Sequence, residues 1–248
     1  MIDAFSLHNK KILVTGASSG IGKVIAEKLS EKGATLTITG RNELRLRATL
    51  ENLNGESHQS VIADLTNSTE LQSLAEKSER LDGVVFCAGV MHEQLLTKQM
   101  DLSSLETVFN VNFKSQIALY QQLHSKKKIS QHASLVFISS ISAVSAVPAT
   151  LAYATSKAAI NSAVRVLASE LSKLGVRVNS ISPGLIETPL LENTFLNKEV
   201  FEKNAVKYPL GPGKCEDVAN AVIFLLSDAS RWITGTDLIV DGGYMLRQ

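Results

Sequence analysis

Short runs of apolar residues alternate with longer helical patterns along the chain, and this alternation restricts the fold more than any other feature. The runs Val84–Phe86 and Leu135–Ile138 are continuously apolar, which is typical of strands buried on both faces of a parallel sheet. Parallel strands are joined by crossover helices, and helices on both faces make a doubly wound fold. We therefore predict an α/β fold with a seven-stranded parallel sheet and helices on both faces.

The bounds of the expected elements follow from these runs and periods. We expect strands over Lys11–Thr15, Thr35–Thr39, Ser60–Ala63, Gly83–Cys87, Ser134–Ser139, Arg177–Ser182 and Asp237–Val240. We expect helices over Gly22–Lys32, Glu43–Leu53, Ser68–Glu79, Leu102–Val111, Phe113–Ile129, Ala152–Leu174 and Glu216–Leu226. No repeat, low-complexity tract or linker interrupts the series, so residues 1–248 are expected to form a single domain.

Polar and glycine-containing segments follow most of the expected strands. In parallel sheets of this kind, ligands bind outside the carboxyl ends of the strands. One sheet edge should therefore collect the segments Thr15-Gly16, Thr39-Gly40-Arg41, Asp64, Ala88-Gly89, Ser139-Ser140 and Pro183-Gly184.

A glycine-rich turn at Thr15–Gly22 lies between the apolar run Ile12–Val14 and the helical pattern Val24–Leu29. A strand, a glycine turn and a helix are the context of a dinucleotide-binding fingerprint. Glycines let the backbone approach a pyrophosphate, and the helix N-terminus supplies free N–H groups and a partial positive charge. The spacing here is Gly-x-x-x-Gly-x-Gly, and a turn that binds no ligand is the alternative.

Tyr153 and Lys157 lie four residues apart, so on a helix both side chains share one face. A phenol has an ordinary pKa of about 10, and a fixed cation nearby favours its ionised form. Ser140 supplies a hydroxyl that would hold a carbonyl oxygen. The three residues predict a proton-transfer site for a carbonyl or an alcohol, and the glycine turn would hold the hydride carrier. Alone, a Tyr-x-x-x-Lys pair would be a solvated helix face.

With these motifs the chain resembles the short-chain dehydrogenase/reductase family, and most closely its 3-oxoacyl-(acyl-carrier-protein) reductase-like members. The resemblance covers essentially the whole chain. It also includes Asp64-Leu65, Ala88-Gly89, Asn112, Pro183-Gly184, Thr188 and the tail from Thr234-Gly235 to Asp241-Gly242-Gly243. It implies a Rossmann-type fold and a nicotinamide cofactor. One departure is Phe86-Cys87-Ala88-Gly89, where the family often has Asn-Asn-Ala-Gly, and it puts the side-chain contact at Cys87 in doubt.

The resemblance also implies roles for individual residues. Tyr153 would be the general acid and base, Ser140 would orient the substrate oxygen, and Lys157 would lower the pKa of the tyrosine and bind the ribose. Asn112 would hold a water that relays protons toward Lys157. The implied cofactor contacts are Gly16, Ser18, Ser19, Gly20, Ile21, Gly22, Arg41, Asp64, Leu65, Cys87, Ala88, Gly89, Tyr153, Lys157, Pro183, Gly184, Ile186 and Thr188.

The residues after the second expected strand favour NADP(H) over NAD(H). An acidic residue there would bind the ribose 2′-hydroxyl of NAD(H) and repel a 2′-phosphate. The segment reads Ile38-Thr39-Gly40-Arg41-Asn42, in which Arg41 offers a charged fork for phosphate. By resemblance Asp64 would bond the adenine amino group, and a helix N-cap is its alternative role.

The substrate is less well defined by the sequence. Residues 185–210 carry several apolar side chains, and their length suggests a mobile lid, although the same residues would also suit packing against the body or a second subunit. The pocket should be flanked by Ser140, Ala143, Met91, His92 and Leu190.

Three functions remain open at this point. The first is a reductase of 3-oxoacyl thioesters, and the second is a reductase or dehydrogenase of a small cyclic alcohol, sugar or sterol. The third is a dinucleotide-sensing protein without turnover, which the full set of Asn112, Ser140, Tyr153 and Lys157 disfavours. By resemblance we expect a homotetramer or homodimer built through the helices Phe113–Ile129 and Ala152–Leu174.

Composition excludes several other classes. A formal net charge of +1 offers no footprint for nucleic acid, and no apolar window is long enough to span a membrane. Lys126-Lys127-Lys128 is expected to be a solvated helix end, with a contact to an acidic carrier protein as the alternative. No group of residues has metal-ligand spacing. Two cysteines make no disulfide framework, and with no leader-like N-terminus we expect a cytoplasmic protein.

Overall fold

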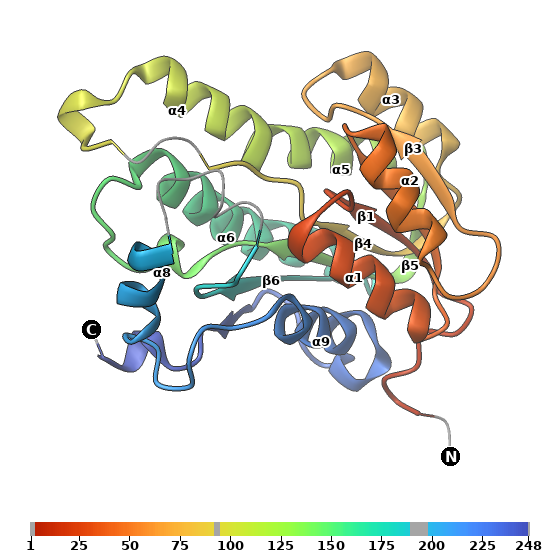
Figure 1. Ribbon diagram of the computed structural model, residues 1–248. Helices are drawn as coiled ribbons and strands as arrows, with labels where there is room; N and C mark the ends of the chain where they lie inside the picture. Colours follow the sequence, from red (N-terminus) through yellow and green to blue (C-terminus); the bar gives the residue numbers. More distant parts are fainter. Residues whose placement is uncertain (1–2, 92–94, 189–197, 248) are drawn as a thin grey trace.

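The protein is built around one parallel sheet. The computed structural model describes residues 3–91, 95–188 and 198–247. Seven strands pair in the order β3-β2-β1-β4-β5-β6-β7, as Figure 1 shows in part. The strands are β1 (Lys11–Thr15), β2 (Thr35–Gly40), β3 (Gln59–Ile62), β4 (Leu81–Phe86), β5 (Ile129–Ile138), β6 (Arg177–Pro183) and β7 (Asp237–Val240). The predicted doubly wound parallel sheet is therefore confirmed, and β1 and β7 have the predicted bounds.

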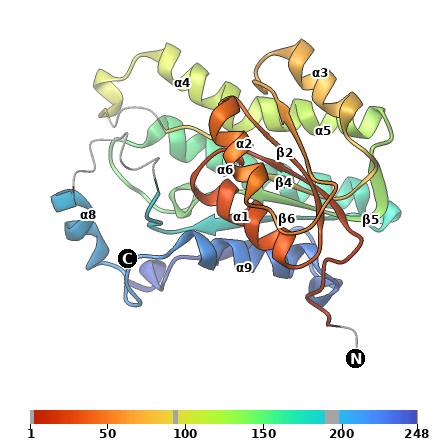
Figure 2. The ribbon, with the colours of Figure 1, turned by 45° about the vertical axis from the view of Figure 1, so that its right-hand side comes forward.

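Helices cover both faces of this sheet, as Figure 2 shows. The α-helices are α1 (Gly20–Glu31), α2 (Glu43–Glu51), α3 (Ser68–Lys77), α4 (Leu102–Phe109), α5 (Ser115–Ser125), α6 (Leu151–Leu171), α8 (Lys198–Ala205) and α9 (Cys215–Leu226). Shorter helical turns are η1 (Thr97–Gln99), η2 (Asn110–Lys114), η3 (Ile141–Ala143), η4 (Ser172–Leu174), η5 (Asp228–Ser230) and η6 (Tyr244–Arg247).

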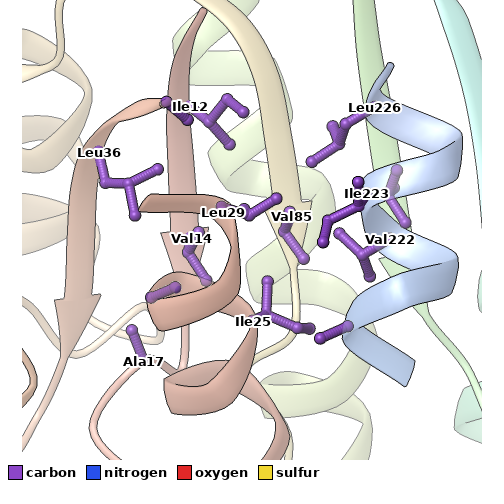
Figure 3. Close-up of a cluster of buried hydrophobic side chains, with 14 of the residues drawn as sticks. Ile12, Val14, Ala17, Ile25, Leu29, Leu36, Val85, Val222, Ile223 and Leu226 are labelled. Carbon is purple, nitrogen blue, oxygen red and sulfur yellow. The ribbon is translucent and has the colours of Figure 1, made fainter. Parts of the chain in front are cut away.

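Alternate strand residues enter two separate cores. On β1, Ile12 and Val14 belong to one cluster of buried side chains and Leu13 belongs to the other, because successive side chains of a strand point to opposite faces. The first cluster packs against α1 and α9, and Figure 3 shows Ile25 and Val222 of these helices meeting over the sheet. The second cluster is completed by α3, α5 and α6. Burial on both faces explains why these strands are almost purely apolar.

The order of the strands creates a switch point between β1 and β4. The chain runs outward from β1 through β2 to β3 and then returns to pair β4 on the other side of β1. The loops after β1 and β4 therefore diverge, and a crevice opens at the carboxyl ends of these two strands. This is the edge at which the sequence collects its glycines and hydroxyls.

Most of the other elements differ from their predicted bounds by a few residues, and two of them differ more. The helix expected over Phe113–Ile129 is a π-helical turn, η2, followed by α5, and it ends at Ser125. The strand β5 begins at Ile129, before the predicted Ser134, and its pairing with β4 is irregular between Leu81 and Gly83. His132 in this stretch has a positive φ of 63°, which interrupts the regular extended backbone of β5.

No helix among residues 3–91, 95–188 and 198–247 combines the length and the apolar character that a membrane crossing requires.

Candidate active site

A cavity of about 470 Å³ opens at the carboxyl edge of the sheet. Residues from the loops after β1 to β6 line it, as the strand pattern predicts. The first strand contributes the glycine turn, the fourth contributes Cys87 and Ala88, and the fifth contributes Ser140. The start of α6 adds Tyr153 and Lys157. The fold thus brings together residues that lie more than 100 positions apart in the chain.

The glycine turn is shaped so that only glycine fits at two positions. Gly16 has a φ of +68°, and a Cβ there would lie 2.9 Å from Cα of Ala88. A Cβ on Gly22 would lie 2.3 Å from the carbonyl oxygen of Gly16. The turn can therefore pack against β4 and against itself only without side chains, and its backbone remains accessible from the cavity.

The N-terminus of α1 borders this cavity. Ser19 is the N-cap of α1, and its side chain accepts no capping hydrogen bond from the described part of the chain. The first N–H groups of a helix have no partner inside the helix and attract anions. Ser18, Ser19, Ile21 and Gly22 all line the cavity, so this end of α1 suits a pyrophosphate.

Thr15 fastens the end of β1 to the turn after β4. Its fully buried hydroxyl accepts hydrogen bonds from the N–H groups of Cys87 (2.9 Å) and Ala88 (3.1 Å) and donates to the carbonyl of Val85 (3.3 Å). The backbone of Cys87 and Ala88 is thereby held against the cavity without the asparagine side chains that the family often has there.

Two amide side chains hold the next part of the same turn. Asn112 in η2 accepts from the N–H of Val90 (2.7 Å) and donates to its carbonyl (2.9 Å) and to the hydroxyl of Ser156 (3.1 Å). Gln116, one turn further, donates to the carbonyl of Ala88 (2.7 Å). Both side chains are fully buried. Gln116 was not predicted, because an isolated glutamine inside a helix gives no signal in the sequence.

Ser140, Tyr153 and Lys157 meet on one wall of the cavity. Lys157 donates from Nζ to the carbonyl of Ile138 (2.8 Å), and Nζ lies 5.7 Å from the centre of the Tyr153 ring. The hydroxyl of Ser139 donates to the backbone carbonyl of Lys157 (3.1 Å), which fixes α6 against the end of β5. The predicted placement of the phenol and the amine on one helix face is therefore what the structure has.

Burial shifts the pKa values of this group. Burial raises the pKa of the Tyr153 phenol above its ordinary value, and the hydrogen bond with Ser140 offsets only part of this effect. The net shift has burial as its largest cause, so the lowering of this pKa by Lys157 stays a prediction. Lys157 is itself buried, and burial lowers its pKa to about 8. An amine with such a pKa is only partly charged in mildly alkaline solution.

The thiol of Cys87 faces the same environment. Burial raises its pKa to about 12, and the nearby charge of Lys157 offsets only part of the increase. The thiol is therefore protonated and a poor nucleophile at neutral pH. Cys87 lines the cavity as a small neutral side chain in place of an amide.

Arg41 and Asp64 form the other end of the cavity. Nη1 of Arg41 lies 3.9 Å from Oδ2 of Asp64, and about two thirds of the arginine side chain, 64%, is exposed. Burial alone would raise the pKa of Asp64, but hydrogen bonds from Thr66 and the charge of Arg41 outweigh it and keep that pKa below its ordinary value. Asp64 is not the N-cap of the following helix, because Asn67 caps α3. Its carboxylate instead accepts from the N–H and hydroxyl of Thr66.

The turn at Pro183-Gly184 faces two stacked tyrosines. A Cβ on Gly184 would lie 2.8 Å from Cε1 of Tyr208 and 2.9 Å from Cα of Asp241. The ring of Tyr208 stacks on that of Tyr244 with 4.7 Å between ring centres, and both rings line the cavity. Burial raises the pKa of Tyr208 to about 12, so its hydroxyl stays protonated. The C-terminal segment therefore completes this wall, a contact that strand and helix periodicity do not indicate.

The cavity also contains an unsatisfied polar atom. Oγ1 of Thr39, at the end of β2, is buried and has no hydrogen-bond partner among the described residues. Thr39 lines the cavity next to Gly40 and Arg41. A buried hydroxyl without a partner is costly unless a ligand or water satisfies it. Together with the glycine cradle, this atom shows that the residues present fit a dinucleotide.

Most of the predicted site residues line this one cavity. Among the predicted cofactor contacts, Gly20 is the exception, since it starts α1 without lining the cavity. Of the proposed substrate residues Ser140 and Met91 line it, and Ala143 does not. Asn112 acts behind the wall through its hydrogen bonds. His92 and Leu190 lie outside the described residues, as do residues 189–197 of the segment 185–210 expected to be a lid.

Two of the three lysines at 126–128 tie elements together, and Lys127 is exposed. Nζ of Lys126 lies 2.9 Å from Oε1 of Glu76, and Lys128 donates to the carbonyls of Glu76 (3.1 Å) and Ser78 (2.6 Å). They thereby fasten the loop before β5 to the end of α3. No group of three or more potential metal ligands occurs in the part of the chain that the structure describes.

A parallel sheet with a switch point, a glycine cradle, and a serine, a tyrosine and a lysine on one wall define a nicotinamide-dependent oxidoreductase. A family model described as enoyl-(acyl carrier protein) reductase matches residues 16–245. The chain belongs to the short-chain dehydrogenase/reductase family, and it is an enzyme acting between CH–OH and C=O groups.

Two curated relatives and one solved structure illustrate the similarity. A 3-oxoacyl-(acyl-carrier-protein) reductase of Rickettsia felis is 34% identical over 247 residues, covering 99% of this chain and 100% of the relative. A glucose 1-dehydrogenase of Gluconobacter oxydans is 31% identical, covering 96% of this chain and 92% of the relative. A short-chain type dehydrogenase/reductase from Mycobacterium ulcerans has a TM-score of 0.89 at 34% identity, covering 98% and 92% of the two chains.

Proposed function

We propose that this enzyme is an NADP(H)-dependent reductase of 3-oxoacyl thioesters, built as one catalytic domain. The observation that carries the proposal is the meeting of Ser140, Tyr153 and Lys157 at a cavity whose other end holds the glycine turn and Arg41. Support for the substrate class comes from relatives over the full length of the chain, which are named as reductases of 3-oxoacyl groups on acyl carrier protein.

Tyr153 and Ser140 have separate roles at the carbonyl oxygen of the substrate. When bound, the reduced nicotinamide supplies a hydride to the carbonyl carbon. Tyr153 donates its phenolic proton to the carbonyl oxygen, and its raised pKa keeps that proton in place until the oxygen becomes basic. Ser140 donates a hydrogen bond to the same oxygen and stabilises its developing negative charge.

Lys157 and Asn112 act behind the phenol. The lysine, with a pKa of about 8, is able to hold a ribose hydroxyl and to return a proton toward Tyr153. The side-chain amide of Asn112 is already hydrogen-bonded to Val90 and Ser156. Asn112 would therefore contribute to a proton path through its backbone, and it also fixes the turn after β4. This assigns Asn112 a positioning role first.

Specificity for NADP(H) rests on the adenosine end of the cavity. Arg41 is mostly exposed, and its Nη1 lies as far as 3.9 Å from Oδ2 of Asp64. The guanidinium is therefore able to bind a ribose phosphate through bidentate hydrogen bonds. Ser18 packs close to Gly40 and offers a second donor beside it. No acidic residue occupies the segment from Ile38 to Asn42 that would select the free ribose hydroxyl.

The decisive experiment follows NADPH oxidation at 340 nm with acetoacetyl thioester, using the wild-type enzyme and Tyr153→Phe. We expect turnover by the wild type and a loss of about 10²–10⁴-fold in kcat for the variant, because it lacks the positioned proton. NADPH binding, measured by fluorescence titration, should remain. The assignment of Tyr153 fails if the variant keeps its turnover.

A sugar or another small alcohol is the second candidate substrate. It is favoured by the similarity to a glucose 1-dehydrogenase over almost the whole chain. A panel of cyclic ketones, aldoses and sterols tested alongside the thioester separates the two. The apolar side chains of Leu95, Met100 and Val108, in a pocket beside Tyr153, favour the acyl substrate.

We further propose a homotetramer in a reducing, cytoplasmic compartment. Val166 on α6 is apolar and more than half exposed, at 54%, so this helix offers a face to a second copy of the chain. Cys87 and Cys215 are both free thiols, which fits a compartment without disulfide formation. Light scattering tests the assembly.

A further inference from the structure

A second, smaller cavity lies on the other side of Tyr153. It has a volume of about 70 Å³ and is enclosed between the loop that includes η1, the helix α4 and the first turn of α6. Met91, Thr150 and Tyr153 line both this side pocket and the main cavity. A substrate held by the Tyr153 hydroxyl in the main cavity would therefore have the side pocket as its immediate neighbour.

Most of the residues that line the side pocket are apolar, and the hydroxyl-bearing ones are Ser104, Thr150 and Tyr153. Leu95, Met100, Val108 and Ala152 supply its walls. The hydroxyl of Thr150 is occupied, because it donates to the carbonyl of Val147 (2.7 Å). The apolar side chains on its walls favour an alkyl group over a charged group, since a polar group placed against them would lose its hydrogen bonds to water.

The backbone at the rim of this pocket is held in an uncommon conformation. Ala149 has a φ of 64°, in the left-handed region that residues other than glycine seldom adopt. Strained backbone of this kind tends to occur where a ligand must be contacted. Ala149 directly precedes Thr150, the N-cap of α6. Both residues line the side pocket together with Met91, Met100 and residues of α4.

The main cavity has polar residues where it borders α8. Asn204 and Lys207, at and just after the end of α8, line it, and Nζ of Lys207 donates to Oδ1 of Asn204 (2.9 Å). A substrate whose ketone lies at Ser140 and Tyr153 thus meets carbon on one side and amide and ammonium groups on the other.

We propose that the side pocket binds the alkyl end of the acyl substrate, beyond the keto carbon, and so sets the chain length that the enzyme prefers. The thioester end would leave past Asn204 and Lys207. A cavity of about 70 Å³ admits roughly five to seven water-sized groups, at 10–15 Å³ for each, and a methylene group is no smaller than a water. The optimum should therefore be a chain with about five carbons beyond the ketone. The inference rests on the proposed function.

The test compares kcat/KM for 3-oxoacyl thioesters with one, three, five and nine carbons beyond the keto carbon. We expect kcat/KM to rise by up to about fourfold for each methylene buried, as far as the five-carbon chain. It should then level off or fall for the nine-carbon chain, whose extra carbons find no room.

Two variants of opposite effect make the assignment specific. Ser104→Phe fills the side pocket from α4, and the preference for the five-carbon chain over acetoacetyl thioester should fall by more than tenfold. Met100→Ala enlarges the pocket and should move the optimum to a longer chain. Leu102→Phe, at a highly exposed position on the same helix, is the matched control and should keep the wild-type profile.

Circular dichroism and NADPH titration establish that each variant folds. If the enzyme reduces the thioesters and both pocket variants keep the wild-type chain-length profile, the side pocket is not the alkyl site and the proposed function still stands. If no variant and no wild-type sample reduces any of the thioesters, both proposals are overturned together.

Discussion

At the scale of single residues, burial dominates the chemistry of the site. Lys157 and Tyr153 belong to one helix turn, and proximity alone would stabilise the ionised forms of both. The structure instead raises the pKa of the phenol and lowers that of the amine to about 8, because both groups are removed from water. The site therefore favours a neutral phenol that is ready to donate its proton.

The lowered pKa of Lys157 has a consequence for stability. Its pKa is about 8 in the folded protein against 10.5 for the free side chain, so the unfolded chain binds more protons here between these two values. Stability therefore rises with pH across that window. Relative to Lys157→Met, the wild type should gain up to about 3 kcal/mol in free energy of unfolding between pH 7 and pH 10.

Urea titrations at several pH values, followed by circular dichroism, measure this difference. Parallel pH profiles of the two proteins would show that Lys157 has an ordinary pKa in the folded state.

Arg41 carries a second prediction at this scale. Arg41→Asp removes the proposed phosphate ligand and places a carboxylate beside Asp64, so NADPH should be repelled. We expect KM for NADPH to rise by at least about tenfold, since charge-assisted hydrogen bonds contribute about 1.5–3 kcal/mol, while KM for NADH changes much less. Steady-state kinetics with NADPH and with NADH measure the two KM values. Arg47→Asp, on the exposed face of α2, is the matched control, and equal effects on the two cofactors would contradict the assignment.

At the scale of elements, the site depends on the turn after β4 being held from behind. The η2 turn and the start of α5 send Asn112 and Gln116 to the backbone of Val90 and Ala88. A π-helical turn inserts an extra residue into a helix, and such turns are frequent at functional sites. Here it lies in the element that supports the cavity wall formed by Ala88 and Gly89.

Gln116 tests the importance of this support. Gln116→Leu leaves the buried carbonyl of Ala88 without its donor, at a cost of about 1–3 kcal/mol, so the turn should shift and KM for NADPH should rise roughly tenfold. We expect a smaller change in kcat, because Tyr153 and Ser140 are attached to other elements. Gln121→Leu, at an exposed position of α5, should behave as the wild type. Equal kinetics of both variants would remove Gln116 from the site.

Several elements could be predicted from the sequence because their signals are local. The strands around Val84 and Leu135 are apolar runs, and the glycine turn is bounded by a strand and a helix in the sequence itself. The start of β5 and the η2 turn could not be predicted. Their backbone is decided by pairing with Leu81 and by contacts with β4, which lie far away in the chain.

At the scale of the whole molecule, the cofactor should act as a structural ligand. The dinucleotide cavity joins loops from β1 to β6 and the C-terminal segment, so its occupant contacts most of the sheet edge. A ligand at 100 times its Kd stabilises the folded state by about 2.7 kcal/mol, which corresponds to a rise in Tm of roughly 5–10 °C for a protein of this size.

We therefore expect NADPH to raise Tm in differential scanning fluorimetry, and NADH at the same concentration to raise it much less. Tyr153→Phe should keep the NADPH shift, because the stabilisation requires binding and not turnover. A larger shift with NADH would contradict the proposed cofactor.

By itself, the sequence determined three features: the succession of strands and helices along the chain, the glycine turn, and the placement of Tyr153 and Lys157 on one helix face. These depend on periodicity and on neighbours within a few residues, which a sequence states directly. Only the tertiary structure decided the direction of the pKa shifts, the support from Gln116, the closing wall of Tyr208 and Tyr244, and the apolar pocket beside Tyr153. Each of these depends on burial, and burial is produced by residues that meet only after the chain has folded.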